Sequence, residues 1–444
     1  MKPMRHQLES LEFCRMRRRV FDMSSPGTGK TLVQIIDFAA QHKKDRKALL
    51  VLAPKSLLKA AWANDIRKFA PHLKVSIAWA HNRKEAFATP ADVYITNIDA
   101  VTDLVKWPKT HWAGFGRIVV DESTAYKNPQ SKRSKAVAKL AKHFEWRRLM
   151  SGTPMPQGIC DLWHQVYILD EGKRLGTSFF NFRAQTCTPI QNGPSAQHIK
   201  WIDKDGIQDA VVALINDMVV RHQFEDCVDI PPNHQYARAI ELSPKHARFY
   251  ADFETSQLAL IEGKTITAIN AAALNTKLLQ VASGAVYNDQ GGYSLIDNAR
   301  YELILDLVEE RKHSIVFYQW GHQLEELSKE AKKRRVSYCV WNPDKPDLEQ
   351  QFQAGMYQTM FAHPASAGHG LTLTRATATI LASPTYNLEH YLQLYKRIYR
   401  IGQKEKTETI VIVGEGTRDE HAWARMLDKK IRQDDFFTSI KAAT

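Results

Sequence analysis

The sequence predicts an α/β protein with two doubly wound parallel-sheet units and a helical insertion between them. The chain has 444 residues, several times the roughly 150 residues of a typical single domain. Short apolar runs alternate with helical patterns near both ends of the chain, and the middle reads mostly as helix. Strand-helix alternation of this kind is typical of parallel sheets covered by helices.

The expected strands of the first unit are short apolar runs flanked by turn residues, as is typical of buried parallel strands. They span 48–53 (ALLVLA), 93–96 (VYIT), 117–120 (RIVV) and 148–151 (RLMS). A helical pattern covers 31–41, between the glycines at 27 and 29 and the first of these strands. The pattern therefore predicts one complete α/β unit in the first third of the chain.

The middle of the chain has a different pattern. Residues 161–223 read mostly as helix, with a polar Gly- and Pro-containing stretch at 191–195. Consecutive prolines at Pro231 and Pro232 stop helices and stiffen a connection, so we place the domain boundary there, between 1–230 and 231–444. Residues 243–283 again read as helix. Strands are then expected at 314–318, 337–341, 359–362, 379–382 and 409–413.

Amino-acid composition and net charge indicate which class of protein to expect. Hydrophobic residues make up 44% and charged residues 25%, an ordinary globular balance. No apolar run approaches the ~18 residues of a membrane span, and the five cysteines form no CxxC pair. We expect a cytoplasmic, monomeric protein with reduced thiols and no membrane partner. The net charge of +13 favours polyanionic partners such as nucleic acids.

A phosphate-binding loop is predicted at residues 24–31, SSPGTGKT. Glycines let the backbone N–H groups face a phosphate, and the following helix N-terminus adds partial positive charge. Lys30 would reach the β and γ phosphates of ATP, and Thr31 would hold Mg²⁺. The residues expected to bind the nucleotide here are Pro26, Gly27, Thr28, Gly29, Lys30 and Thr31.

An acidic pair follows the strand at 117–120. Asp121 and Glu122 would lie at the carboxyl edge of the sheet, where α/β folds bind ligands. Asp121 would hold Mg²⁺, and Glu122 would orient and deprotonate the attacking water. The next strand ends in SGTP, so the Ser151 and Thr153 hydroxyls are expected beside the γ-phosphate, where they would couple its presence to nucleic-acid contacts.

The order GKT, DExx and SGTP resembles superfamily-two helicases, and further segments resemble their Swi/Snf-like branch. DEST stands where that branch often has DEAH, and 51–58 (VLAPKSLL) followed by Trp62 is similar to its PxSLLxxW segment. Residues 366–374 resemble AGGxGLNLT, 393–403 (QLYKRIYRIGQ) resemble QAxxRxHRIGQ, and 416–420 resemble GTxDE. The resemblance covers nearly the whole chain.

This resemblance implies two RecA-like lobes that hydrolyse ATP between them. Gln7 would recognise adenine. Gln393, Arg397 and Arg400 would lie on one helical stretch, and the two arginines, three residues apart, would share a face. In the family such arginines reach the ATP phosphates, where a guanidinium stabilises transition-state charge. Which of Arg397 and Arg400 is the main finger stays open.

The family's nucleic-acid contacts map to strand ends and loops. In the first lobe they fall on Lys55 and Ser56 and on Thr96 and Asn97. In the second lobe they fall on Ser366 and Gly368. Short polar side chains and backbone N–H groups contact phosphates without reading sequence. The resemblance therefore implies a translocase on double-stranded DNA that remodels protein–DNA complexes.

Two alternatives stay open at this point. A strand-separating helicase acting on DNA or RNA would need a wedge element, for which the 291–293 turn (GGY) is a weak candidate. An ATP-gated DNA clamp or scaffold would bind DNA and recruit a partner without needing a complete hydrolytic set. The presence of that set disfavours the clamp, and nucleic-acid-dependent ATP turnover separates the three readings.

Overall fold

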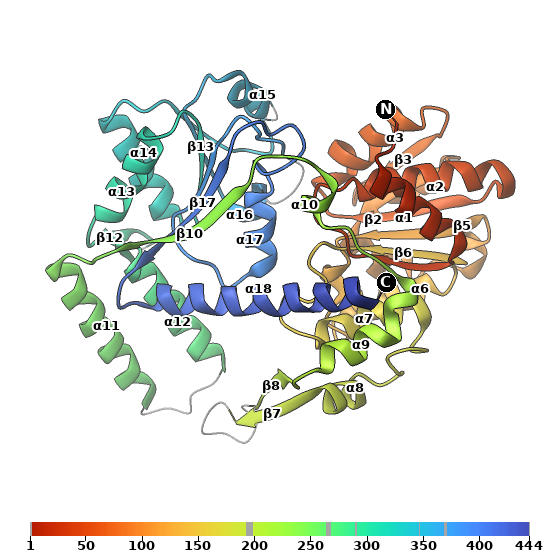
Figure 1. Cartoon of the computed structure of the whole chain (residues 1–444), viewed down its shortest axis with the longest axis horizontal. Helices are drawn as coiled ribbons and strands as arrows, with labels where there is room; N and C mark the ends of the chain where they lie inside the picture. Colours follow the sequence, from red (N-terminus) through yellow and green to blue (C-terminus); the bar gives the residue numbers. More distant parts are fainter. Residues whose placement is uncertain are drawn as a thin grey trace. The chain divides into compact units, whose positions relative to one another are not determined.

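A computed structural model describes residues 2–191, 199–262, 268–288, 291–345, 347–367 and 371–443. Its contacts divide the chain into two compact units (Figure 1). The first unit comprises Met1–Ile190, Trp201–Asp229 and Lys429–Thr444, and the second comprises Gln191–Lys200 and Ile230–Asp428. The long helix α18 (Arg418–Ala443) therefore begins in the second unit and ends in the first. Within the described segments, no helix is long and apolar enough to cross a membrane.

The first unit is built on a parallel sheet with strand order β3-β4-β2-β5-β6-β1-β9. Its strands are β1 (Arg19–Asp22), β2 (Ala48–Ala53), β3 (Val75–Ala78), β4 (Val93–Asn97), β5 (Phe115–Asp121), β6 (Trp146–Met150) and β9 (Val219–Val220). The main helices are α1 (Arg5–Met16), α2 (Lys30–Asp45), α3 (Asn64–Phe69), α4 (Arg83–Ala88), α5 (Val101–Leu104), α6 (Lys132–Ala141), α7 (Cys160–Asp170), α8 (Phe179–Thr186), α9 (Ile207–Ile215) and α10 (Phe224–Cys227).

Burial on both faces of the sheet explains why its strands read as continuous apolar runs. Along β2, Leu49 and Val51 pack with residues of α2 and α3 on one face. Leu50 and Leu52 pack on the other face with residues of α5, α6 and α7. Side chains alternate between faces along a strand, so a strand covered twice needs no polar face. All four strands expected from the sequence in this unit are present.

Five strands in the first half of the chain, β1, β3, β7 (Cys187–Gln191), β8 (Ile199–Asp203) and β9, differ from the sequence-based expectation. Strands β1 and β3 were not expected, because each is only four residues long and mixes polar with apolar residues. The prediction of a mostly helical 161–223 is wrong for the two-stranded sheet of β7 and β8. β7 is largely exposed and β8 is mostly half-buried, and their short, mixed sequences carry little of the regular alternation that identifies a strand. Most of the polar 191–195 stretch lies outside the described residues.

The second unit has a parallel sheet with order β10-β17-β16-β13-β15-β14. Its strands are β10 (Asn233–Ile240), β13 (Ser314–Phe317), β14 (Tyr338–Val340), β15 (Thr359–Ala362), β16 (Ala378–Leu381) and β17 (Thr407–Gly414). Its helices are α11 (Pro244–Glu262), α12 (Ala268–Ala282), α13 (Ala299–Glu309), α14 (Gly321–Lys333), α15 (Asp347–Ala354), α16 (Pro364–Ala367) and α17 (Leu388–Tyr395), and β11 (Ala285–Tyr287) pairs antiparallel with β12 (Tyr293–Leu295).

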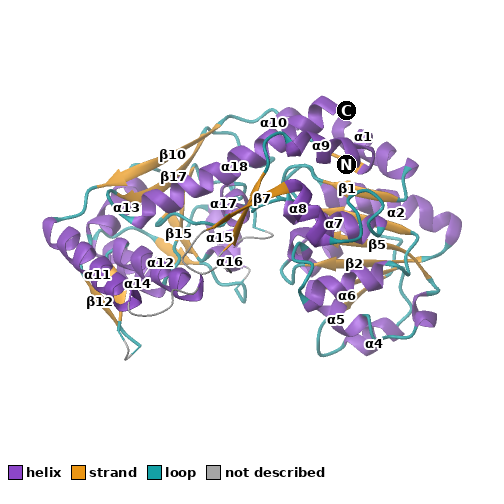
Figure 2. Ribbon diagram, turned by 90° about the horizontal axis from the view of Figure 1, so that it is seen from below, coloured by secondary structure: helices purple, strands orange, loops and turns teal. Residues whose placement is uncertain are grey.

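Helices α13 and α14 cover one face of this second sheet, and α17 lies on its other side (Figures 1 and 2). The five strands expected from the sequence between 314 and 413 are present. The segment 243–283 is helical in its described part, as α11 and α12. The two sheets with helices on both faces confirm the predicted α/β class.

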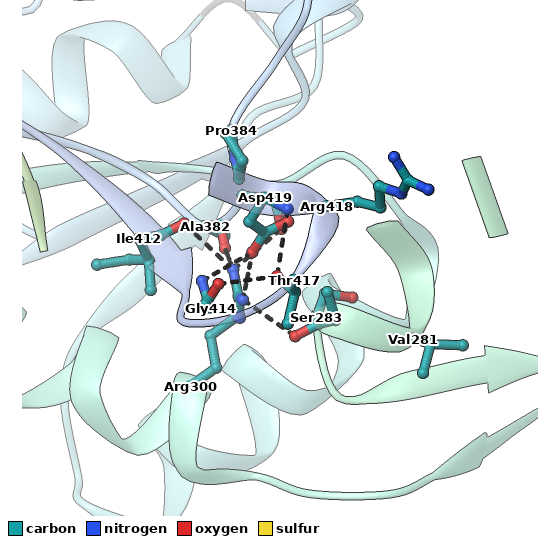
Figure 3. Close-up of polar contacts among 12 residues, drawn as sticks. Val281, Ser283, Arg300, Ala382, Pro384, Ile412, Gly414, Thr417, Arg418 and Asp419 are labelled. Atoms are coloured by element: carbon teal, nitrogen blue, oxygen red, sulfur yellow. Dashed lines mark hydrogen bonds and ion pairs between the residues drawn. The ribbon is translucent and has the colours of Figure 1, made fainter. Parts of the chain in front are cut away.

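A buried ion pair joins the elements at one end of the second sheet (Figure 3). Arg300 at the start of α13 contacts Asp419 at the start of α18, with 2.5 Å between Nη2 and Oδ2. The Arg300 guanidinium also donates to the carbonyl oxygens of Ala282, Ala382 and Ile412. Asp419 in turn accepts the N–H of Gly414 at 3.0 Å. One guanidinium thus joins α12, α13, β16, β17 and α18.

Candidate functional site

The phosphate loop lies between β1 and α2, at the carboxyl edge of the first sheet. Gly27 and Gly29 have φ angles of +89° and +84°, in the left-handed region that favours glycine. A Cβ on Gly29 would collide with the side-chain amide of Gln7, so this glycine is also needed for close approach. The loop therefore curls before the N-terminus of α2, as a phosphate cradle requires.

Lys30 points into this curve. Its Nζ donates to the carbonyl oxygens of Ser24 at 2.7 Å and of Ser25 at 3.2 Å. The Thr28 hydroxyl donates to the same Ser25 carbonyl at 2.9 Å. These contacts hold the ammonium group inside the loop, where the phosphates of ATP are expected.

Ser24 stands where the longer phosphate-loop pattern usually has a glycine, and the structure gives it a role. Its hydroxyl accepts the N–H of His222 at 3.1 Å, and its own N–H donates to Asp22 Oδ1 at 2.9 Å. The next N–H, of Ser25, donates to the carbonyl of His222 at 2.9 Å. The serine thus ties the loop to the segment that follows β9.

Gln7 contacts the loop from α1. Its Nε2 donates to the carbonyl of Thr28 at 3.0 Å, and its Oε1 accepts the N–H of Met4 at 2.9 Å. His6 reaches the same Thr28 carbonyl through Nε2, at 2.8 Å. The structure therefore brings the glutamine expected at the base of ATP into contact with the phosphate loop. His6 was not singled out by its sequence position.

Asp121 ends β5 and is buried beside the loop. Its Oδ2 accepts the indole N–H of Trp62 at 2.9 Å, and its Oδ1 accepts the N–H of Glu122 at 3.1 Å. Trp62 is fully buried. Trp62 was noted in the sequence only as part of a resembling segment, and its contact with the acidic pair was not foreseen.

Glu122 adopts a left-handed backbone conformation, with φ of +52°. For a residue with a Cβ this conformation costs roughly 1–2 kcal/mol. It turns the chain sharply at the end of β5 into a short 3-10 helix, Ser123–Tyr126. Backbone strain of this kind is concentrated at functional sites, which is consistent with the catalytic role expected for this carboxylate.

The SGTP segment is bonded to the acidic segment and abuts the phosphate loop. The hydroxyls of Thr124 and Ser151 lie 2.7 Å apart, and Ser151 Oγ accepts the N–H of Thr153 at 3.1 Å. A Cβ on Gly152 would lie 2.6 Å from Cδ of Pro26. Sequence analysis missed Thr124 as a partner, because a single threonine beside DE carries no distinctive pattern.

The two arginines expected at the ATP phosphates lie in the second unit, beyond the end of α17. That helix ends at Tyr395, so the prediction of one helical stretch from Gln393 to Arg400 is wrong. The N–H of Arg397 donates to the carbonyl of Leu394, three residues earlier, instead of to that of Gln393. The Gln393 carbonyl instead accepts a hydrogen bond from Nε of the Arg397 side chain at 2.8 Å. This tightens the chain into turns.

Both arginines nevertheless contact the same carbonyl. Arg400 Nη1 donates to the oxygen of Leu371 at 2.7 Å, and Arg397 Nη1 reaches it at 3.5 Å. Nearby, burial raises the pKa of Glu349, and burial lowers the pKa of Arg400. Gln393 is buried in α17, and its amide donates to Glu389 at 3.3 Å.

The residues expected to contact nucleic acid differ in exposure. Lys55 and Ser56 are exposed after β2, whereas Asn97 is the last residue of β4 and is largely buried. Thr96 is fully buried and its hydroxyl donates to the carbonyl of Ala78, so this side chain is not presented to a ligand. Ser366 is partly exposed in α16. Gly368 lies outside the described residues.

A family model for the SNF2-related domain matches residues 7–284. That match covers more than half of the chain. The chain belongs to the SNF2-related family. It is an ATP-hydrolysing enzyme of helicase superfamily two, and its fold is built on two parallel sheets.

Relatives of this SNF2-related protein include phage and bacterial proteins. It is 30% identical over 438 residues to protein p41 of Acyrthosiphon pisum secondary endosymbiont phage 1, over 94% of this chain and 93% of that one. It is 23% identical over 408 residues to the uncharacterized ATP-dependent helicase MG018 of Mycoplasma genitalium, of which it spans only 38%. A Sulfolobus solfataricus SWI2/SNF2 ATPase core, solved in complex with dsDNA, aligns with 99% of this chain and 95% of its own, at a TM-score of 0.47 and 22% identity.

The metal site expected in this SNF2-related protein uses few protein ligands. Within the described ranges, no group of three or more His, Cys, Asp and Glu side chains could hold a metal ion. Mg²⁺ is usually held by one or two carboxylates together with water and substrate phosphates. The Asp121 carboxylate and the Thr31 hydroxyl supply the hard oxygen donors that this arrangement needs.

Proposed function

We propose that this protein is a DNA-stimulated ATPase that moves along double-stranded DNA and remodels the protein–DNA complexes it meets. The observation that carries the proposal is the assembly of three motifs at one edge of the first sheet: the acidic segment is hydrogen-bonded to the SGTP segment, and Gly152 of that segment packs against Pro26 of the phosphate loop. Relatives named as an ATP-dependent helicase and as a SWI/SNF-related regulator of chromatin support the same class of activity.

The chemistry assigned to the first unit is activation of water for attack on the γ-phosphate. Lys30 and the loop N–H groups bind the phosphates, and Thr31 and Asp121 hold Mg²⁺. When bound, Mg²⁺ neutralises charge on the β and γ oxygens. Glu122, at the sharp turn that its left-handed backbone makes after β5, is the base proposed to orient the water and take its proton.

The Thr124–Ser151 hydrogen bond supports a coupling role for the SGTP segment. Pro26 of the phosphate loop meets Gly152, so a movement of the loop on nucleotide binding would press directly on this segment. Thr124 belongs to the segment that carries the catalytic glutamate, and its hydroxyl also donates to the carbonyl of Thr153 at 3.1 Å. The Thr124–Ser151 pair thus offers a short path from the expected position of the γ-phosphate to the ends of β5 and β6.

Arg397 and Arg400 are assigned to charge stabilisation in the transition state. Their shared contact with Leu371 supports this role, because Leu371 lies within the segment, 366–374, that resembles the family's AGGxGLNLT loop. A guanidinium that reaches the γ-phosphate can stabilise charge that develops during phosphoryl transfer. Closure of the two lobes would complete the site and exclude water.

Backbone contacts are proposed to provide the grip on DNA. Lys55 and Ser56 are exposed at a strand end, where a lysine and a hydroxyl suit phosphate oxygens. The net charge of +13 adds long-range attraction. Such contacts carry little sequence information, so movement is expected to be insensitive to sequence and steeply dependent on salt.

A strand-separating role is less well supported. The aromatic residue of the expected wedge, Tyr293, donates its hydroxyl to Glu326 of α14 at 2.6 Å. Among the described residues of the β11–β12 hairpin, this side chain is therefore anchored on α14 and is not presented for insertion between bases.

The deciding experiment measures steady-state ATP turnover without nucleic acid and with duplex DNA, single-stranded DNA or RNA, at about 50 and about 200 mM salt. Stimulation by duplex alone, together with displacement of a triplex-forming strand from duplex DNA, supports the translocase. Preference for single strands or RNA would replace it with a helicase. Binding of ATP and DNA without turnover would favour the clamp.

A further inference from the structure

A cavity of about 430 Å³ opens in the first unit beside the phosphate loop. Three segments far apart in the sequence form its walls: residues 4–9 of α1 and the turn before it, residues 221–227, and the end of α18. Figure 2 shows the C-terminal end of α18 near α1 and α9, and the side chain of Gln208 in α9 bonds to the carbonyl of Arg432. All of these residues belong to the first unit.

Two of the three walls hold the phosphate loop directly. From α1, His6 contacts the carbonyl of Thr28 at 2.8 Å. From the second wall, Arg221 Nη1 donates to the carbonyl of Met23 at 2.6 Å. The cavity therefore lies next to the phosphate loop, on the side of the loop that Gln7 also contacts.

The third wall comes from α18. The guanidinium of Arg221 lies 3.7 Å from the centre of the Phe437 ring, and Lys441 Nζ lies 3.1 Å from Asp226 Oδ2. Phe437 and Ile440 line the cavity, and because they are only 2% and 1% exposed, packing holds both side chains in place. Lys441 and Asp226 are exposed and form the rim.

The lining suits a flat heteroaromatic ring with polar edges. Its volume falls in the range of small-ligand sites, about 300–1,000 Å³. The His222 ring faces that of His6, with 5.6 Å between the ring centres, and burial lowers the pKa of His222. A neutral imidazole can donate at one nitrogen and accept at the other. Its buried Nε2 has no hydrogen-bond partner among the described residues.

We infer that the end of α18 forms one wall of the pocket that receives the base of ATP, with Phe437 and Ile440 as its apolar surface and Lys441 at its rim. This inference rests on the proposed function, because it requires ATP at the phosphate loop. It makes nucleotide affinity depend on residues at the end of α18, more than 400 positions from the loop in sequence.

Site-specific labelling tests the wall without disturbing the core. Cysteine is introduced at the rim in K441C and, as a matched control on the same helix, in K430C, whose lysine pairs with Asp434 at 2.8 Å outside the cavity. Alkylation of each position is followed by peptide mass spectrometry. ADP should slow alkylation at 441 several-fold and leave 430 unchanged, whereas pyrophosphate should protect neither position.

Charge reversal provides a second, kinetic test. K441E should raise the KM for ATP by about threefold to tenfold with kcat unchanged, because a rim charge acts on binding and not on the reacting phosphate. The double variant K441E/D226K restores the pair with opposite polarity and should recover part of the affinity. K430E should match the wild type.

The outcomes distinguish failure of the α18 inference from failure of the proposed ATPase function. Binding of a fluorescent ATP analogue by the wild type, with no protection at 441 and no change in KM in K441E, would overturn the α18 wall and leave the ATPase standing. Equal protection by pyrophosphate would also overturn it, since the effect would then come from the phosphates. Absence of nucleotide binding by the wild type would overturn both.

Discussion

The indole N–H of Trp62 donates a hydrogen bond to Oδ2 of Asp121, with 2.9 Å between the two atoms. The residues are 59 positions apart, and Trp62 is fully buried. The bond fixes one oxygen of the carboxylate that is assigned to Mg²⁺, while the N–H of Glu122 fixes the other. We therefore expect Trp62 to act as a positioning residue for the proposed metal site.

Replacing Trp62 with Phe keeps most of the packing and removes the bond. We expect the Mg²⁺ concentration for half-maximal ATP turnover to rise about tenfold, since groups that orient metal ligands typically contribute that much. Titration of turnover with Mg²⁺ measures it. W112F is the matched control, because Trp112 is also buried and its Nε1 has no hydrogen-bond partner among the described residues. An equal shift in both variants would refute the positioning role.

Glu122→Gln should lose ATP turnover by about two to four orders of magnitude, the usual contribution of a general base. Binding of ATP and DNA should persist, because the amide keeps the size of the side chain. Single-turnover hydrolysis and DNA binding by fluorescence anisotropy measure the two properties. E145Q, at an exposed site in the same unit, serves as control. Turnover near the wild-type rate would exclude Glu122 as the base.

Thr124→Val removes the hydroxyl contact with Ser151 and keeps the shape of the side chain. We expect the ratio of DNA-stimulated to unstimulated turnover to fall at least several-fold, because the bond joins the acidic segment to the SGTP segment. The KM for ATP should change little. Thr102→Val, at a half-buried threonine of α5, is the control. Full DNA stimulation in Thr124→Val would show that coupling runs elsewhere.

Asp419→Asn leaves the buried Arg300 guanidinium without its ionic partner. Breaking one side of a buried pair typically costs about 3–5 kcal/mol, so thermal unfolding of the second unit should shift to markedly lower temperature. Differential scanning calorimetry measures the shift. D434N, which breaks the exposed pair with Lys430, should cost under about 1 kcal/mol. Similar losses in the two variants would argue against the structural role of the Arg300–Asp419 pair.

Acid should destabilise the first unit through His164. Burial lowers the pKa of His164 to about 4, and its ring bonds to the carbonyl of Tyr126 at 2.7 Å. The unfolded chain takes up the proton near pH 6.5 and the folded chain only near pH 4, so stability is present above pH 6.5 and is lost as the pH falls through this window. By about pH 5 the loss is about 2 kcal/mol.

His164→Gln removes this titration. We expect the difference in melting temperature between about pH 7.5 and about pH 5 to become smaller than in the wild type. H81Q, at an exposed histidine of the same unit, should retain the wild-type difference. An unchanged difference in H164Q would assign the acid sensitivity to other groups.

Features carried by neighbouring residues could be predicted from the sequence alone. The phosphate loop, the acidic pair and the SGTP turn are contiguous, and the order of these motifs along the chain identified the family. Strands such as β2 and β13 could be predicted because burial on both faces requires an unbroken apolar run. Short or exposed strands such as β1 and β7 could not, since too few residues carry the pattern.

Tertiary structure decided the contacts between distant segments. Trp62 with Asp121, Arg221 with Phe437 and Arg300 with Asp419 meet only because the chain folds, and nothing local marks these partners. The end of α17 at Tyr395 was decided in the same way, because the carbonyl of Arg397 accepts the N–H of Leu373 from another segment. Local sequence determines which functional groups the chain carries, and long-range packing determines which of those groups come into contact.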